Sequence, residues 1–185
     1  MSSREAGGQK TLTMILMALF AAATGVLSWI SLPLPFTPVP VNLALVGVLL
    51  AGNTLGFMGK ANGGTYSMLI YIALGAMGVP VFSGGNAGAG VLVGPTGGFI
   101  LGYVLAAFFA GHFCARRQGN VIVGSVLNMI AILLCYLPGI VWFVTSTGCT
   151  VEAGLVACVL PFLPGDALKS IVVALVCSRM SKLQF

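Results

Sequence analysis

The sequence is poor in charge. Asp and Glu together number three and Lys and Arg number eight among 185 residues, so that 6% of the chain is charged and the formal net charge is +5. Soluble domains are about 25% charged, so this chain has too few ionic side chains to cover a surface in water. A nucleic-acid-binding protein needs a basic stripe on a soluble face, and the low charge excludes that class as well.

Residues that build catalytic and metal centres are also scarce. His112 is the single histidine, so no metal site is expected there. The five cysteines are odd in number and form no C-x-x-C pair, which excludes a disulfide framework. We expect the cysteines to act as small apolar side chains. No G-x-x-x-x-G-K-[ST] motif occurs, so the chain does not bind ATP in that way. We expect no cofactor and no catalytic residue.

Apolar residues are abundant. They make up 58% of the chain, and the mean hydropathy is +1.09. A helix needs about 20 apolar residues to cross a bilayer, and the absence of strict period-2 alternation argues against a barrel. We predict an all-α, polytopic membrane protein with six transmembrane helices near 12–31, 41–58, 64–80, 98–115, 120–146 and 164–181. Residues 1–11 form a cytoplasmic N-terminal segment and residues 12–185 a single six-helix membrane domain.

Basic residues predict the orientation of this bundle. If six helices place both termini on one side, seven of the eight basic residues fall on that side: Arg4, Lys10, Lys60, Arg116, Arg117, Arg179 and Lys182. The positive-inside rule then assigns both termini to the cytoplasm. The predicted location is a cell membrane that the chain crosses several times.

Two of the three predicted outer loops have unusual compositions. Loop 31–41 contains four prolines, which favour a stiff extended strap. Loop 80–97 is rich in glycine, so its bare backbone can approach a small molecule closely. The alternative is that these loops are simply a rigid and a flexible linker.

The sixth predicted helix carries an acid and a base inside an apolar run. Asp166 lies near its start, where the helix dipole favours an anion, and Lys169 follows at i+3 on the same face. Charges at membrane depth usually mark a ligand site or a transport path. We expect Lys169 to hold a ligand carboxylate and Asp166 to accept hydrogen bonds from ligand N–H groups. The alternative is a structural ion pair.

Other side chains complete the candidate pocket. Asn86 in the glycine-rich loop offers a donor and an acceptor, and Tyr71 and Phe82 offer aromatic walls. Asn128, in the middle of the fifth predicted helix, is expected to bridge helices instead.

Small residues line one side of the first predicted helix. Ala18 and Ala22 are four residues apart, with Ala21 and Gly25 in a parallel row. Such spacing lets a second helix approach closely, either within the bundle or from a separate membrane subunit.

Three sequence segments together resemble those of one known family. PLPFTPVPV at 33–41, GVPVFSGGNAG through GPTGG at 78–98, and PFLPGDALK at 161–169 look like the signatures of the BioY family. Its members are biotin-specific substrate-binding (S) components of energy-coupling factor (ECF) transporters. Many members carry Thr-Gln after the proline-rich segment, where this chain has Asn42 and Leu43, so the contribution of the second helix to the pocket stays open.

The resemblance implies a six-helix protein that captures biotin from outside and performs no chemistry on it. Separate subunits hydrolyse ATP, and a transmembrane coupling protein docks on the first helix, at Ala18 and Ala22. The acid and base of the family's sixth helix correspond to Asp166 and Lys169. Biotin has a cyclic urea, a carboxylate and an apolar bicycle, which suit an acceptor, a cation or other donor, and apolar walls. Which end of biotin meets Lys169 stays open.

Two other functions fit the sequence less well. An intramembrane enzyme needs a nucleophile with a positioned base or a metal set, which this chain lacks. A self-sufficient secondary transporter of a small carboxylated solute typically shows an internal repeat with broken helices in both halves, and no convincing repeat is present.

Overall fold

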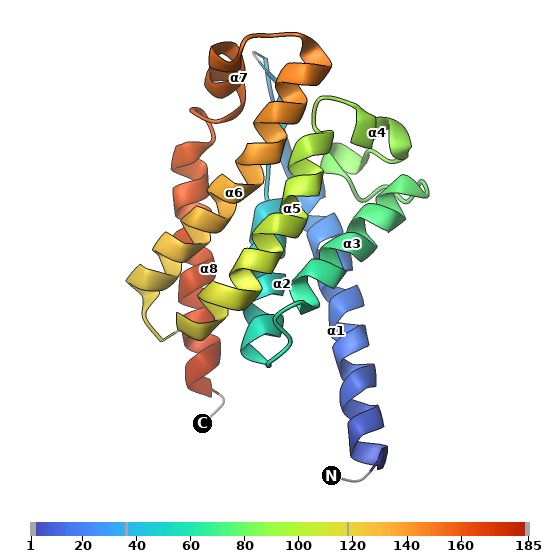
Figure 1. Cartoon of the computed structure of the whole chain (residues 1–185), viewed down its shortest axis with the longest axis vertical. Coiled ribbons are helices and arrows are strands. Elements are labelled where there is room, and N and C mark those ends of the chain that lie inside the picture. Colours follow the sequence, from blue (N-terminus) through green and yellow to red (C-terminus); the bar gives the residue numbers. More distant parts are fainter. Residues whose placement is uncertain (1–2, 36, 118, 184–185) are drawn as a thin grey trace.

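The computed structural model describes residues 3–35, 37–117 and 119–183. Figure 1 shows a bundle of long helices with short elements at one end. The long helices are α1 (Ser3–Trp29), α2 (Ala44–Phe57), α3 (Gly63–Ala76), α5 (Gly97–Phe109), α6 (Val121–Thr147) and α8 (Leu163–Leu183). The short ones are α4 (Ala89–Val93), α7 (Val151–Cys158) and the 3-10 turn η1 (Ser83–Gly85). Helix α5 continues through a π-helical turn, η2 (Ala110–Cys114), into η3 (Ala115–Arg117).

Each of the six predicted apolar segments overlaps one long helix, and α1 begins at Ser3, well before the predicted start of the first span at residue 12. Three helices in the described residues are long and apolar enough to span a membrane by themselves: Gly8–Trp29, Gly97–Arg117 and Val121–Thr147. A fourth candidate span consists of two helices that are bent by 52° at a short break: α7 and residues Leu163–Lys182 of α8. Helices α2 and α3 are apolar but have 14 residues each.

The proline-rich loop forms an antiparallel β-hairpin, which the all-α prediction missed. Strand β1 (Ser31–Leu34) pairs with β2 (Thr37–Asn42), and Ser31 lies opposite Asn42. Both strands of a two-stranded ribbon are edges, so a proline that cannot donate a hydrogen bond is tolerated there. The predicted extended geometry is correct, and the pairing of the two halves is the new feature.

The two termini lie at the same end of the bundle, as Figure 1 shows, while the hairpin, α4 and α7 gather at the opposite end. The α2–α3 connection and the turn before α6 lie toward the end with the termini. The seven basic residues that set the predicted orientation therefore belong to segments at one end of the molecule.

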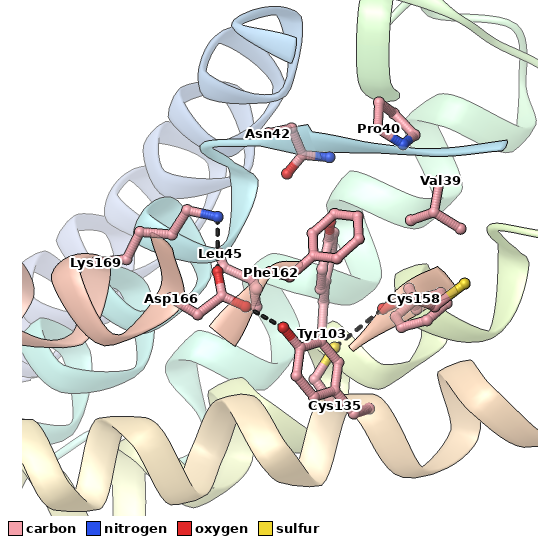
Figure 2. Close-up of a pocket in the computed structure, with 12 residues that line it drawn as sticks. Val39, Pro40, Asn42, Leu45, Tyr103, Cys135, Cys158, Phe162, Asp166 and Lys169 are labelled. Atoms are coloured by element: carbon pink, nitrogen blue, oxygen red, sulfur yellow. Dashed lines mark hydrogen bonds and ion pairs between the residues drawn. The ribbon is translucent and has the colours of Figure 1, made fainter. Parts of the chain in front are cut away.

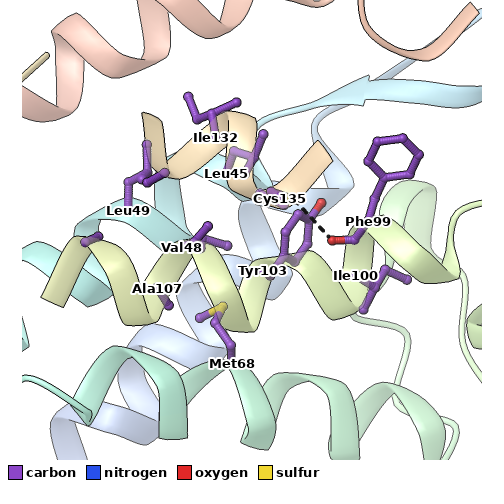
Figure 3. Close-up of a cluster of buried hydrophobic side chains, with 14 of the residues drawn as sticks. Leu45, Val48, Leu49, Met68, Phe99, Ile100, Tyr103, Ala107, Ile132 and Cys135 are labelled. Carbon is purple, nitrogen blue, oxygen red and sulfur yellow. Dashed lines mark hydrogen bonds between the residues drawn. The ribbon is translucent and has the colours of Figure 1, made fainter. Parts of the chain in front are cut away.

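The core is built around α5, which packs against α2, α3 and α6 (Figure 3). Glycines allow the closest approaches. A Cβ on Gly64 of α3 would lie 2.6 Å from the Cα atom of Gly52 on α2, so neither position accepts a larger residue without movement of the backbone. Small residues in this way let membrane helices pack at short range.

Buried amides join three helices below the hairpin. The Nδ2 group of Asn53 on α2 donates to Oδ1 of Asn128 on α6 at 2.9 Å, and Nδ2 of Asn128 donates to the carbonyl of Ser170 on α8 at 3.4 Å. The predicted bridging role of Asn128 is thus confirmed.

Candidate functional site

Asp166 and Lys169 form a buried ion pair on successive turns of α8. The Nζ atom of Lys169 lies 2.8 Å from Oδ1 of Asp166 (Figure 2). The Asp166 side chain is 1% exposed and that of Lys169 is 9% exposed. Asp166 lies in the first turn of α8, where unpaired backbone N–H groups and the helix dipole favour a carboxylate. A lysine ammonium has three donors, so Lys169 retains capacity for further hydrogen bonds.

A second helix holds the same carboxylate. The hydroxyl of Tyr136 on α6 donates a hydrogen bond to Oδ2 of Asp166, so both carboxylate oxygens have a partner. Sequence reasoning missed Tyr136, because its contact with Asp166 joins residues 30 apart in the chain. The available signal was a polar-tipped aromatic within a long apolar helix, since a buried tyrosine hydroxyl usually finds a partner.

The ion pair lines a cavity near the hairpin end of the bundle. Strand β2 covers it, and its walls are mainly apolar and aromatic. The lining residues are Val39, Pro40, Asn42, Leu45, Phe99, Tyr103, Cys135, Tyr136, Cys158, Phe162, Asp166 and Lys169. The cavity encloses about 40 Å³, whereas pockets for small organic ligands enclose roughly 300–1,000 Å³. A bicyclic solute therefore fits beside Asp166 only if the covering strand or the lining side chains move.

Two further hollows continue toward the surface. An adjoining cavity of about 30 Å³ is lined by Tyr71 and shares Asn42, Phe99 and Tyr103 with the first. A groove of about 460 Å³ runs between the hairpin and the glycine-rich segment around α4. Pro40 of β2 lines all three hollows, so this strand stands between the groove and the interior.

The structure brings only part of the predicted ligand set together. Asp166 and Lys169 share the first cavity, and Tyr71 lines the second. Asn86 lies outside both cavities: it is exposed, lines the groove, and donates to the Ser83 carbonyl at 2.7 Å. Phe82 is fully buried and packs edge-on against Tyr71, with 5.6 Å between ring centroids.

Asn42 joins the two outer loops above the ion pair. Its Nδ2 group donates to the hydroxyl of Ser83, and its Oδ1 accepts from the backbone N–H of Ala44 at 3.1 Å. Figure 2 shows Asn42 on β2 across the cavity from Lys169. Asn42 thus lines the cavity and links the hairpin to the glycine-rich loop.

The small residues of α1 face two directions. Ala21 and Gly25 are buried, and a Cβ on Gly25 would lie 3.1 Å from the Val81 side chain. Ala18 and Ala22 are exposed, in a row with the exposed Leu19. The inner row therefore packs within the bundle, and the outer row is exposed on the surface of the described chain.

Comparison with known proteins gives a consistent result. The model of the BioY family matches residues 1–184. The biotin transporter BioY of Rhizobium etli is 35% identical over 176 residues, which cover 89% of this chain and 90% of that protein. Its counterpart in Thermotoga maritima is 34% identical over 173 residues, covering 92% and 96%. A crystal structure at 2.1 Å of the S-component for biotin from an ECF-type ABC transporter matches with a TM-score of 0.85 and 27% identity, covering 98% of this chain and 95% of that one.

Proposed function

The chain belongs to the BioY family, and from that premise we propose that it is the high-affinity membrane subunit that binds biotin for uptake. It is a transport component and not an enzyme. ATP is hydrolysed by a separate ECF module. The observation that carries the proposal is the buried Asp166–Lys169 pair, which lines a cavity beneath the hairpin.

The chemistry of the cavity suits biotin. The urea of biotin has two N–H donors, and the Asp166 carboxylate is an ionised acceptor that remains partly available beside its two partners. Because the Nζ atom of Lys169 lies 2.8 Å from Asp166, Lys169 takes the carboxylate of a valeryl chain that folds back toward the urea. Phe99, Tyr103 and Phe162 pack on the apolar bicycle. The interaction with each charged group is strengthened by exclusion of water from the site.

The other predicted ligand residues have less direct roles in this proposal. Tyr71 extends the apolar wall through the second cavity. Phe82 acts through Tyr71, because the two rings are in edge-on contact. Asn86 in the groove contacts the solute at the outer end of its path, since Pro40 separates the groove from the interior.

The positions of the elements support a membrane arrangement that belongs to the same proposal. All six long helices span the membrane, with the bent pair α7–α8 as the last span and the shorter α2 and α3 within the bundle. Both termini and residues 1–11 face the cytoplasm, where the basic residues lie, and residues 12–185 form one domain in the plasma membrane. The hairpin, the groove and α7 face outward.

The exposed small-residue row of α1 is the proposed contact for the transmembrane coupling protein of the ECF module. Ala18 and Ala22 leave a shallow face on which a second helix can lie close. The absence of a P-loop motif from the sequence requires such partners for ATP-driven uptake.

Calorimetry on the purified chain in detergent tests the assignment. We expect saturable, one-to-one binding of biotin without nucleotide, and biotin among the small molecules that co-purify. A folded preparation that gives no binding signal with biotin contradicts the substrate. Uptake of biotin by vesicles that contain this chain alone, without ECF subunits, contradicts the dependence on a separate module.

A further inference from the structure

Tyr136 differs from the other aromatic residues of the cavity in what its hydroxyl does. It comes from α6, the helix that packs along α8, and it donates to the Asp166 oxygen that Lys169 does not contact. Asp166 is thereby held from two sides: by a lysine on its own helix and by a tyrosine on the neighbouring helix.

The ring of Tyr136 is fixed by its surroundings. It is 5% exposed and stands edge-on to Phe99, with 6.1 Å between ring centroids. Phe99 is itself confined, because a Cβ on Gly139, one turn after Tyr136, would lie 2.4 Å from its ring. A hydroxyl on such a ring donates close to the plane of the ring, and a hydrogen bond to a carboxylate in a dry site is among the stronger ones.

A lysine contact alone leaves a carboxylate free to rotate about its last bond, because an ammonium attracts either oxygen equally well. A second donor on the other oxygen removes that freedom. Recognition of a solute through its N–H groups depends on where the remaining lone pairs point, so the residue that sets the rotation also sets the recognition.

We propose that Tyr136 is a positioning residue for solute recognition: its hydroxyl bond to Oδ2 turns the Asp166 carboxylate so that its free lone pairs face the N–H donors of the ligand. This inference rests on the proposed function, in which Asp166 accepts from the urea of biotin. It gives Tyr136 a role through Asp166, distinct from the apolar contacts that its ring makes with the cavity.

A double-mutant cycle tests the inference, with biotin affinity of the purified chain as the readout. Tyr136→Phe keeps the ring and removes the hydroxyl, and we expect it to weaken binding roughly tenfold. In an Asp166→Asn background the same change should alter affinity less than twofold, because the group through which it acts is gone. Tyr103→Phe is the matched control: it removes another hydroxyl of the same cavity, and its effect should be equal in both backgrounds.

A second ligand distinguishes contacts at the urea of biotin from contacts at its carboxylate. Biotin methyl ester keeps the urea and lacks the free carboxylate, so Tyr136→Phe should weaken binding of the ester and of biotin by the same factor. An effect on biotin that disappears with the ester places Tyr136 at the carboxylate and overturns the inference. An effect of Tyr136→Phe that is equal with and without Asp166 overturns it too, because packing alone then explains the loss.

The failure of the proposed function has a different signature. If Asp166→Asn and Lys169→Ala both bind biotin as the unaltered chain does, the ion pair is not the binding site. If Asp166→Asn weakens binding and Tyr136→Phe leaves it unchanged, the proposed function stands and the positioning role is refuted. Thermal unfolding of each variant in detergent identifies any loss that comes from misfolding.

Discussion

Replacement of Lys169 by methionine separates the structural and the ligand-binding roles of the buried pair. The change keeps an unbranched apolar side chain, one atom shorter, and removes the charge. Asp166 is 1% exposed, so it is left as a carboxylate in a dry site with Tyr136 as its remaining hydrogen-bond partner. Removal of one partner from a buried ion pair costs about 3–5 kcal/mol of stability. For a chain of this length that corresponds to a fall in melting temperature of roughly 6–20 °C.

The double variant Lys169→Met, Asp166→Asn gives the contrast. It removes both charges, and replacement of a whole buried pair by neutral groups is often neutral or stabilising. We therefore expect its melting temperature to return close to that of the unaltered chain. Biotin affinity should remain at least tenfold weaker, about 1.4 kcal/mol, because both polar contacts with the solute are gone.

Cysteine reactivity provides the unfolding assay. Four cysteines (Cys114, Cys135, Cys158 and Cys177) are buried, so a thiol-reactive fluorescent dye reports their exposure as the bundle opens. Calorimetry on the same preparations gives the affinity. If the Lys169→Met variant has the same melting temperature as the unaltered chain, the claim that Asp166 is desolvated is refuted. If the double variant binds biotin as tightly as the unaltered chain, the ion pair has a structural role and does not bind the ligand.

Three further variants address other parts of the molecule. Asn128→Ala removes the amide bridge between α2, α6 and α8 and should cost about 1 kcal/mol in thermal unfolding, since such bonds in membrane proteins are individually modest; an unchanged melting curve contradicts this. Gly75→Ala places a Cβ about 2.1 Å from the Phe82 ring, so stability and biotin affinity should both fall, whereas Gly119→Ala, with nothing within 4 Å, should change neither. Ala22→Phe adds bulk to the exposed face of α1, so co-purification with ECF subunits should be lost while the isolated chain still binds biotin; unimpaired co-purification places the contact elsewhere.

The helices and the ion pair were predictable because each depends on residues close together in the chain. The apolar runs mark the long helices, and the i, i+3 spacing of Asp166 and Lys169 places both on one face of one helix. Tyr136 was not predictable in the same way. Its partner belongs to another helix, and the rotation of two helices about their axes is set by packing that a single sequence does not display.

Loop geometry limited the prediction of the rest of the site. The prolines of residues 31–41 indicated extended backbone, but pairing of Ser31 with Asn42 depends on a reversal between them. Asn86 was grouped with Asp166 because it lies in an outer loop rich in glycine and its amide offers a donor and an acceptor. The fold instead directs the glycine-rich loop so that Asn86 faces the groove, on the other side of β2.

Strand β2 has a kinetic consequence for any solute that binds beside Asp166. The polar contacts proposed for the solute lie on α8 and are positioned from α6, whereas the strand that covers the cavity belongs to a two-stranded ribbon, a structure of marginal stability by itself. A solute that enters past this strand also leaves past it, so the frequency with which the hairpin opens changes the rates of binding and release by the same factor. Changes in the hairpin can therefore alter how fast the solute exchanges and leave its dissociation constant unchanged.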